Sequence, residues 1–86
     1  MYKLIWTETV LKKLKKMDQA TALKIVKATE AITDDPFMRV KRLVNRNGLY
    51  SLRVGDYRLI VSIQVERSVI VVLAVGHIRN IPYLIS

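Results

Sequence analysis

Residues 53–60 read RVGDYRLI and carry the strongest structural signal in the chain. Gly55-Asp56 is typical of a two-residue hairpin turn that opens with glycine. Such a turn places Arg53 directly opposite Arg58, and side-chain alternation puts both on the same face of the sheet. Like charges that face each other destabilise a sheet. The pair therefore predicts an anion between the two arginines.

The segments that flank this turn alternate in polarity, which predicts strands at 49–54 and 57–65. The more apolar positions are Tyr50, Leu52, Val54, Tyr57, Leu59, Val61, Ile63 and Val65. The opposite positions are Leu49, Ser51, Arg53, Arg58, Ile60, Ser62 and Gln64. Residues 69–75 read VIVVLAV without alternation, and this predicts a central strand that is covered on both faces.

The N-terminal part predicts a short strand at 2–6 and then two helices. Thr7 can cap the first helix, which extends to about residue 16, and Asp18 can cap the second, which extends to about residue 33. Pro36 ends the second helix because the residue before proline avoids helical geometry. So short a break predicts an antiparallel helix hairpin. Residues 37–48 are expected to form a loop that closes at NRNG, residues 45–48.

The predicted elements leave one face of the sheet without cover. Two helices can cover one face of a four-stranded sheet, and no other predicted element covers the second. Part of the apolar surface, including the segment IPYLI at 81–85, is expected to meet another protein. The alternative is that this segment folds back as the cover, and the sequence leaves both open.

The length and charge indicate one small basic domain over residues 1–86. The chain has 15 Lys and Arg residues against 7 Asp and Glu, a formal net charge of +8. Residues 37–58 are the most basic segment, with six cationic residues and one acidic residue. This distribution predicts a polyanionic partner such as RNA or DNA, with an acidic protein as the alternative.

The composition also excludes several classes of site. The chain has no cysteine and one histidine, so neither a disulfide framework nor a Cys- or His-based metal centre is expected. The N-terminus lacks the features of a signal peptide, and the apolar run at 69–75 is too short to span a bilayer. A cytoplasmic location without a membrane partner is therefore expected.

The side chains that remain for chemistry are cationic. Arg53 and Arg58 suit a phosphate, and because guanidinium groups stay protonated they would stabilise transition-state charge rather than act as bases. His77 could be a general acid or base, or a structural hydrogen-bonding residue. Arg79 is either a third phosphate ligand or a surface charge. Tyr83 could stack on an RNA base or simply pack against the sheet.

Nearly the whole chain resembles the RelE/ParE superfamily of toxins from toxin–antitoxin pairs. The residues that carry the resemblance are Pro36, KRL at 41–43, LYSLR at 49–53, GDYRLI at 55–60 and VGH at 75–77. Two positions depart from the RelE pattern. Ser51 stands where well-known RelE members have lysine, and Ile78 stands where a basic residue is common, so Arg79 matches with a one-residue shift.

The resemblance implies an α+β fold: an N-terminal strand and an antiparallel helix hairpin packed on a mainly antiparallel sheet of about four strands. It also implies a ribosome-dependent endoribonuclease that cleaves mRNA in the A site by 2′-OH attack, without a metal or other cofactor. The predicted catalytic residues are Arg53, Arg58, His77, Arg79 and Tyr83. The predicted RNA-binding residues are Lys12, Lys13, Lys15, Lys16, Lys41, Arg42 and Arg46.

The implied partners are a cognate antitoxin, the ribosome and mRNA, with operator DNA contacted only through the antitoxin. Two other functions remain open. A ParE-type toxin shares the fold but poisons DNA gyrase and is not a nuclease. A degenerate toxin would be a non-catalytic module that binds its antitoxin.

Overall fold

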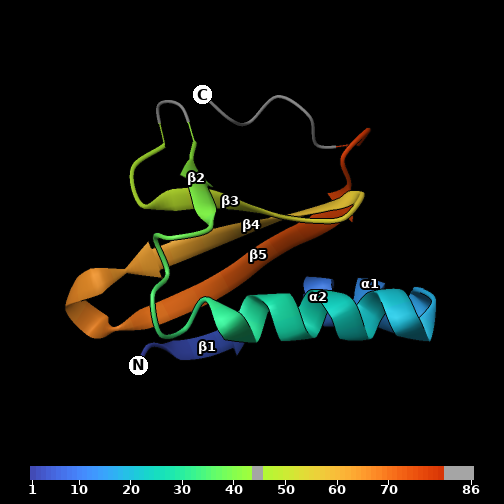
Figure 1. The fold of residues 1–86 in the computed structure, drawn as a ribbon, viewed down its shortest axis with the longest axis horizontal. Helices are drawn as coiled ribbons and strands as arrows, with labels where there is room; N and C mark the ends of the chain where they lie inside the picture. Colours follow the sequence, from blue (N-terminus) through green and yellow to red (C-terminus); the bar gives the residue numbers. More distant parts are fainter. Residues whose placement is uncertain (44–45, 81–86) are drawn as a thin grey trace.

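The hairpin around Gly55 lies within a mixed sheet in the computed structural model, which describes residues 1–43 and 46–80 (Figure 1). The described residues form five strands in the order β1-β5-β4-β3-β2. In chain order the elements are β1 (Lys3–Trp6), α1 (Glu8–Lys16), α2 (Gln19–Ala31), β2 (Val40–Arg42), β3 (Leu49–Val54), β4 (Tyr57–Gln64), the 3-10 helix η1 (Val65–Arg67) and β5 (Val69–His77). The expected α+β fold is confirmed.

The turn chemistry of the hairpin is as predicted. Gly55 has φ +59°, and Asp56 is not among the residues with positive φ. This combination matches a type II′ turn, whose twist agrees with that of the strands. Val54 pairs with Tyr57, and Arg53 pairs with Arg58. The predicted register is therefore confirmed.

The strand β5 is central, as its continuous apolar sequence predicts. It pairs in antiparallel fashion with β4 and in parallel with β1. A register irregularity at Ile60/Val61 leaves Leu73 as the additional residue of β5, and its side chain is 40% exposed. The prediction that both faces of this strand are covered is thus wrong at Leu73. The reason is that both helices lie on the same side of the sheet (Figure 1).

The two helices form the predicted hairpin, and their caps differ. The Asp18 carboxylate accepts a hydrogen bond from the Thr21 backbone N–H at 3.2 Å, so it caps α2 as expected. Thr7 precedes α1, but its hydroxyl donates to the Val72 carbonyl at 2.9 Å and so ties the helix start to β5. The second helix ends at Ala31, two residues before the predicted end.

The segment predicted as a loop at 37–48 contains the edge strand β2, which adds a fifth strand to the four expected. Its three residues pair with β3, from Val40 opposite Leu52 to Arg42 opposite Tyr50. Three residues are too few to show the period of a strand, so this pairing depends on the neighbouring β3. Asn45 lies outside the described residues.

The core lies between the sheet and the helices. Its fully buried members include Val10 and Ile25 from the helices and Leu59, Val61 and Val72 from the sheet. We call this side of the sheet the helix face and the other side the outer face. Within residues 1–43 and 46–80, neither helix has the length and apolar character needed to cross a membrane.

Candidate functional site

The strand register places the two hairpin arginines on the outer face. Cross-strand neighbours share a face, and one row of the sheet consists of Arg53, Arg58 and Gly76. Gly76 has no side chain, so the arginines dominate this row. The next row on the same face consists of Lys41, Ser51, Ile60 and Ala74. The outer face therefore becomes cationic toward the hairpin turn.

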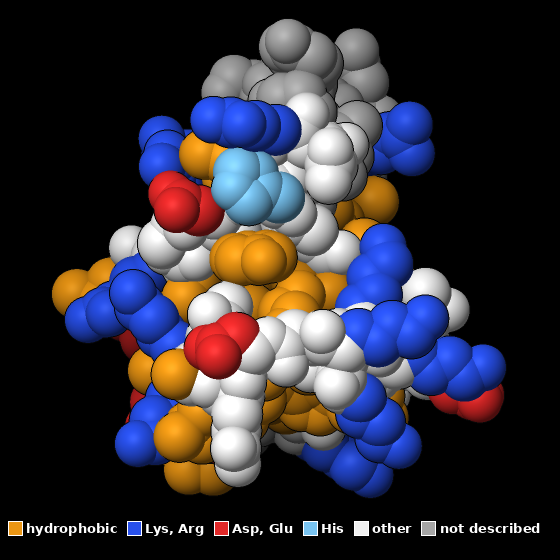
Figure 2. All heavy atoms as spheres, turned by 90° about the vertical axis from the view of Figure 1, so that its right-hand side faces the viewer, with side chains coloured by type: hydrophobic (Ala, Val, Ile, Leu, Met, Phe, Trp, Pro, Cys, Tyr) orange, Lys and Arg blue, Asp and Glu red, His pale blue; other side chains and the backbone are white. Residues whose placement is uncertain are grey.

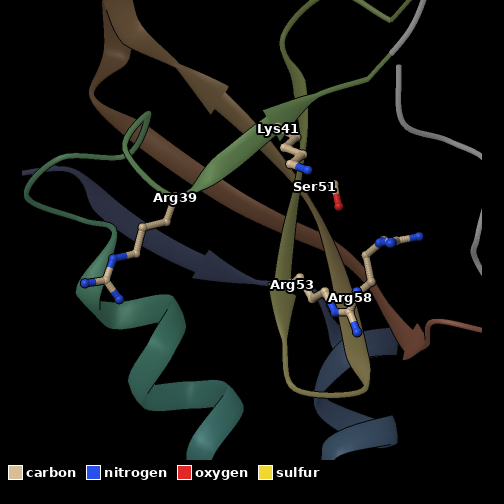
Figure 3. A pocket seen from close by; sticks show the side chains of 5 residues that line it. All are labelled: Arg39, Lys41, Ser51, Arg53 and Arg58. Atoms are coloured by element: carbon tan, nitrogen blue, oxygen red, sulfur yellow. The ribbon is translucent and has the colours of Figure 1, made fainter.

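These rows border a hollow of about 170 Å³ on the outer face (Figure 3). The hollow is lined by Arg39, Lys41, Ser51, Arg53 and Arg58. Four of the five lining residues carry a positive charge, and the fifth offers a hydroxyl. No lining residue in the described chain is acidic. This charge and donor set suits a phosphate group.

The two arginines adopt different conformations. Arg53 is exposed, and its Nε donates a hydrogen bond to the Gly55 carbonyl oxygen at 3.0 Å. Because a guanidinium has five N–H donors, this bond commits only one of them. Arg58 is half-buried, and Figure 3 shows its side chain extending away from the turn, whereas Arg53 bends toward it. A backbone carbonyl of the turn therefore orients the Arg53 side chain.

The sequence predicted Lys41 as an RNA-binding residue in a loop, and it missed Arg39. The structure brings both to the rim of the hollow because β2 pairs with β3. Their i, i+2 spacing is the signal that would place them on one face if a strand were recognised at 40–42. The Arg39 side chain turns away from the two hairpin arginines in Figure 3.

The structure does not bring His77 to the hollow. His77 shares its row with Tyr57 and Val54, which face the helices. Its ring packs edge to face on Tyr57, with ring centroids 5.6 Å apart. The neighbouring Arg79 is exposed and lies in the turn that follows β5.

The other predicted RNA-binding residues are spread around the molecule. The four lysines of α1 are exposed on the helix side. Cationic side chains lie on several sides of the hairpin end in Figure 2 and form no single patch there. Lys12 pairs with Glu8 at 3.5 Å, and Lys13 donates to the Val75 carbonyl at 3.3 Å. Arg42 alternates with Lys41 and so faces the other side of β2, and Arg46 is exposed. Tyr83 lies outside the described residues.

Comparison with known proteins agrees with the fold. A family model described as "ParE toxin of type II toxin-antitoxin system, parDE" matches residues 4–82. The chain belongs to this toxin family. The expected membership of the RelE/ParE superfamily is thereby confirmed, and the protein is a toxin of a type II toxin–antitoxin system. No curated protein matches the chain.

Solved RelE structures share the fold of this toxin. The isolated Escherichia coli RelE toxin is 23% identical over 90% of this chain and 84% of its own, with a TM-score of 0.79. The RelBE2 toxin–antitoxin complex from Mycobacterium tuberculosis gives 28% identity over 88% and 96%, with a TM-score of 0.76. The archaeal RelE–RelB complex from Pyrococcus horikoshii OT3 gives 26% identity over 88% and 93%, with a TM-score of 0.78.

Proposed function

We propose that this toxin is an endoribonuclease that cleaves mRNA in the ribosomal A site in the cytoplasm. The observation that carries the proposal is the hollow beside the hairpin, where Arg53, Arg58 and Lys41 meet without an acidic lining residue in the described chain. A site of this kind attracts the phosphate backbone of RNA. The RelE folds of the solved structures support the same class of activity.

The proposed reaction needs the RNA, the protein and solvent water. The 2′-hydroxyl of one nucleotide gives its proton to water and attacks the adjacent phosphorus. The bond from phosphorus to the 5′-oxygen of the next nucleotide breaks, and that oxygen takes a proton from water, which leaves a 2′,3′-cyclic phosphate and a 5′-hydroxyl. Negative charge accumulates on the phosphate oxygens in the transition state, and the guanidinium groups of Arg53 and Arg58 stabilise it. Both groups remain protonated, so their role is electrostatic.

The exposed cations outside the hollow would hold the nucleic acid more generally. Lys12, Lys13, Lys15 and Lys16 lie on one short helix, and Arg42 and Arg46 lie near the sheet edge. Contacts of this type are independent of sequence and weaken as salt rises. Replacing Lys15 and Lys16 with Gln should reduce the salt dependence of ribosome binding. An unchanged slope would exclude these lysines from the interface.

The proposed protein partner is a cognate antitoxin. The chain belongs to a toxin family of toxin–antitoxin systems, and several of the similar structures are complexes of a RelE with a RelB. The outer face offers apolar area for such a partner, because Ile5 is 39% exposed and Leu73 is 40% exposed. Operator DNA would then be bound through the antitoxin.

Gyrase poisoning is the second candidate function. The family model that matches the chain is that of ParE toxins. Ser51, which lines the hollow and is 3% exposed, also stands where the best-known RelE members have a lysine. A toxin of this kind would trap cleaved DNA on gyrase and leave mRNA intact.

One pair of assays separates the two functions. Purified ribosomes programmed with mRNA are incubated with the toxin, and cuts are mapped by primer extension. In parallel, gyrase and supercoiled DNA are incubated with the toxin, and linear DNA is measured. Cuts at A-site codons support the nuclease. Linear DNA with intact mRNA would replace that proposal with gyrase poisoning.

A matched pair of variants tests the role of the hairpin. Arg58→Ala should slow mRNA cleavage by on the order of 100-fold, the effect of removing one transition-state donor. Arg67→Ala removes the same side chain from η1, outside the hollow, and should leave the rate unchanged. Equal rates for both variants would exclude Arg58 from the site.

A further inference from the structure

Three consecutive backbone N–H groups after β5 each donate a hydrogen bond. Ile78 N–H donates to the Asp56 carbonyl at 2.9 Å, and Asn80 N–H donates to the His77 carbonyl at 2.8 Å. Arg79 N–H donates to the imidazole Nδ1 of His77 at 3.2 Å. His77 therefore supplies two of the three acceptors that define this turn. The third comes from the β3–β4 hairpin.

The hydrogen bond from the Arg79 backbone N–H fixes the tautomer of the neutral His77 imidazole. A nitrogen that accepts a hydrogen bond carries no proton, so the neutral ring has its proton on Nε2. Nδ1 is thus committed to the backbone of Arg79. The ring also stands on the helix face beside Tyr57, whereas Arg53 and Arg58 are on the outer face. A phosphate between the arginines would lie across the sheet from the imidazole.

The hairpin turn contacts both the Arg53 side chain and the segment that carries Arg79. The Gly55 carbonyl accepts from Arg53 Nε, and the Asp56 carbonyl accepts from Ile78 N–H. Two adjacent carbonyls of one turn thus orient Arg53 and anchor the chain that carries Arg79. Figure 2 looks onto this end and shows the histidine, in pale blue, at the surface next to a cationic side chain.

We propose that His77 is a positioning residue: its imidazole holds the turn at residues 78–80 so that Arg79 is presented at the hairpin end. This role deepens the proposed nuclease function and rests on it where it assigns Arg79 to cleavage. It replaces a general-base role for His77. The physical reason is that a fixed backbone turn limits the positions that a long arginine side chain can reach.

Three substitutions at position 77 separate positioning from proton transfer. Asparagine is not a base, but its side-chain oxygen can accept from the backbone N–H two residues on. His77→Asn should therefore keep mRNA cleavage within about threefold of the wild-type rate, the scale of one weak hydrogen bond. His77→Ala and His77→Leu lack the acceptor and should each cut about 10- to 100-fold more slowly. Leucine also keeps an apolar contact for Tyr57, so it controls for lost packing.

A double-mutant cycle tests whether the effect passes through Arg79. Residues that act as a unit give non-additive losses. The variant with both His77→Ala and Arg79→Ala should therefore cut no more slowly than Arg79→Ala alone. Losses that multiply, or a His77→Asn variant as slow as His77→Ala, would overturn the proposal.

A measurement that does not depend on activity addresses the turn itself. Exchange of the Arg79 amide with water, measured by NMR on the full chain at mildly alkaline pH, should be roughly two- to tenfold faster in His77→Ala. It should stay near the wild-type rate in His77→Asn. An unchanged exchange rate in His77→Ala would exclude the positioning role. If the wild-type toxin fails to cut mRNA, the nuclease proposal fails, while the exchange rates still decide the role of His77 in the turn.

Discussion

The two faces of the β3–β4 hairpin are made by the same two strands and have opposite properties. Leu52 and Leu59 form a cross-strand pair on the helix face and are 3% and 0% exposed. Arg53 and Arg58, the next pair along, are on the outer face and line a cationic hollow. Because side chains alternate between the two faces of a strand, residues that stabilise the core and residues available to a ligand occupy neighbouring positions in the sequence. Substitutions on the two faces should have separable effects.

The largest expected effect is on the helix face. Leu59→Ala should lower the free energy of unfolding by about 2–5 kcal/mol, because it opens a cavity in an enclosed core. Ile60→Ala, on the outer face, should cost less, because Ile60 is 6% exposed and lies outside the core cluster between the sheet and the helices. Urea denaturation measures both. Equal losses would show that the outer face is as tightly packed as the helix face.

The turn that joins the two strands gives the next effect. Gly55→Ala should lower the free energy of unfolding by about 1–2 kcal/mol, the cost of a left-handed conformation for a residue with a Cβ. The added Cβ would meet Lys24 Nζ at 3.5 Å, an ordinary contact, so the cost arises in the backbone. Asp56→Ala is the control at a position without positive φ. A variant as stable as the wild type would mean that the turn can change type.

A buried hydroxyl of α2, which packs on the helix face, should have a smaller effect. Thr29 is fully buried, and its Oγ1 donates to the Ile25 carbonyl at 2.7 Å. Thr29→Val keeps the shape and removes this bond, so the free energy of unfolding should fall by about 1 kcal/mol. Thr21→Val removes an exposed hydroxyl and should change the urea midpoint less. The reverse order would contradict a stabilising role for the buried bond.

The smallest expected effect is on the outer face. Repulsion between Arg53 and Arg58 should weaken as salt screens it, so added salt should raise the urea midpoint of the wild type. Arg53→Gln removes the repulsion. Added salt should therefore raise the unfolding free energy of Arg53→Gln less than that of the wild type, by a few tenths of a kcal/mol, which is the lower end of the range for cross-strand pairs. The double variant Arg53→Gln, Arg58→Gln serves as the baseline. Identical salt responses in all three proteins would mean that the arginines do not repel each other.

Local sequence patterns predicted the helix hairpin, the central strand and the facing arginines. They worked because turn chemistry and alternation act between residues close in the chain. They did not reveal β2, so Arg39 was missed and Lys41 was placed in a loop. The local patterns also grouped His77 with the arginines, because the sequence around His77 does not indicate which face of the sheet its side chain occupies. The exposed Leu73 depends on an irregularity between β4 and β5, which a run of apolar residues does not indicate.

By itself the sequence determined the Gly55-Asp56 turn and, through it, the pairing of Arg53 with Arg58. A two-residue turn leaves one register, and the register assigns every side chain of the hairpin to a face. Only the tertiary structure decided that β2 completes the cationic hollow and that His77 stands across the sheet from it. These features depend on pairing between strands that are distant in the chain, where no local rule fixes which residues meet.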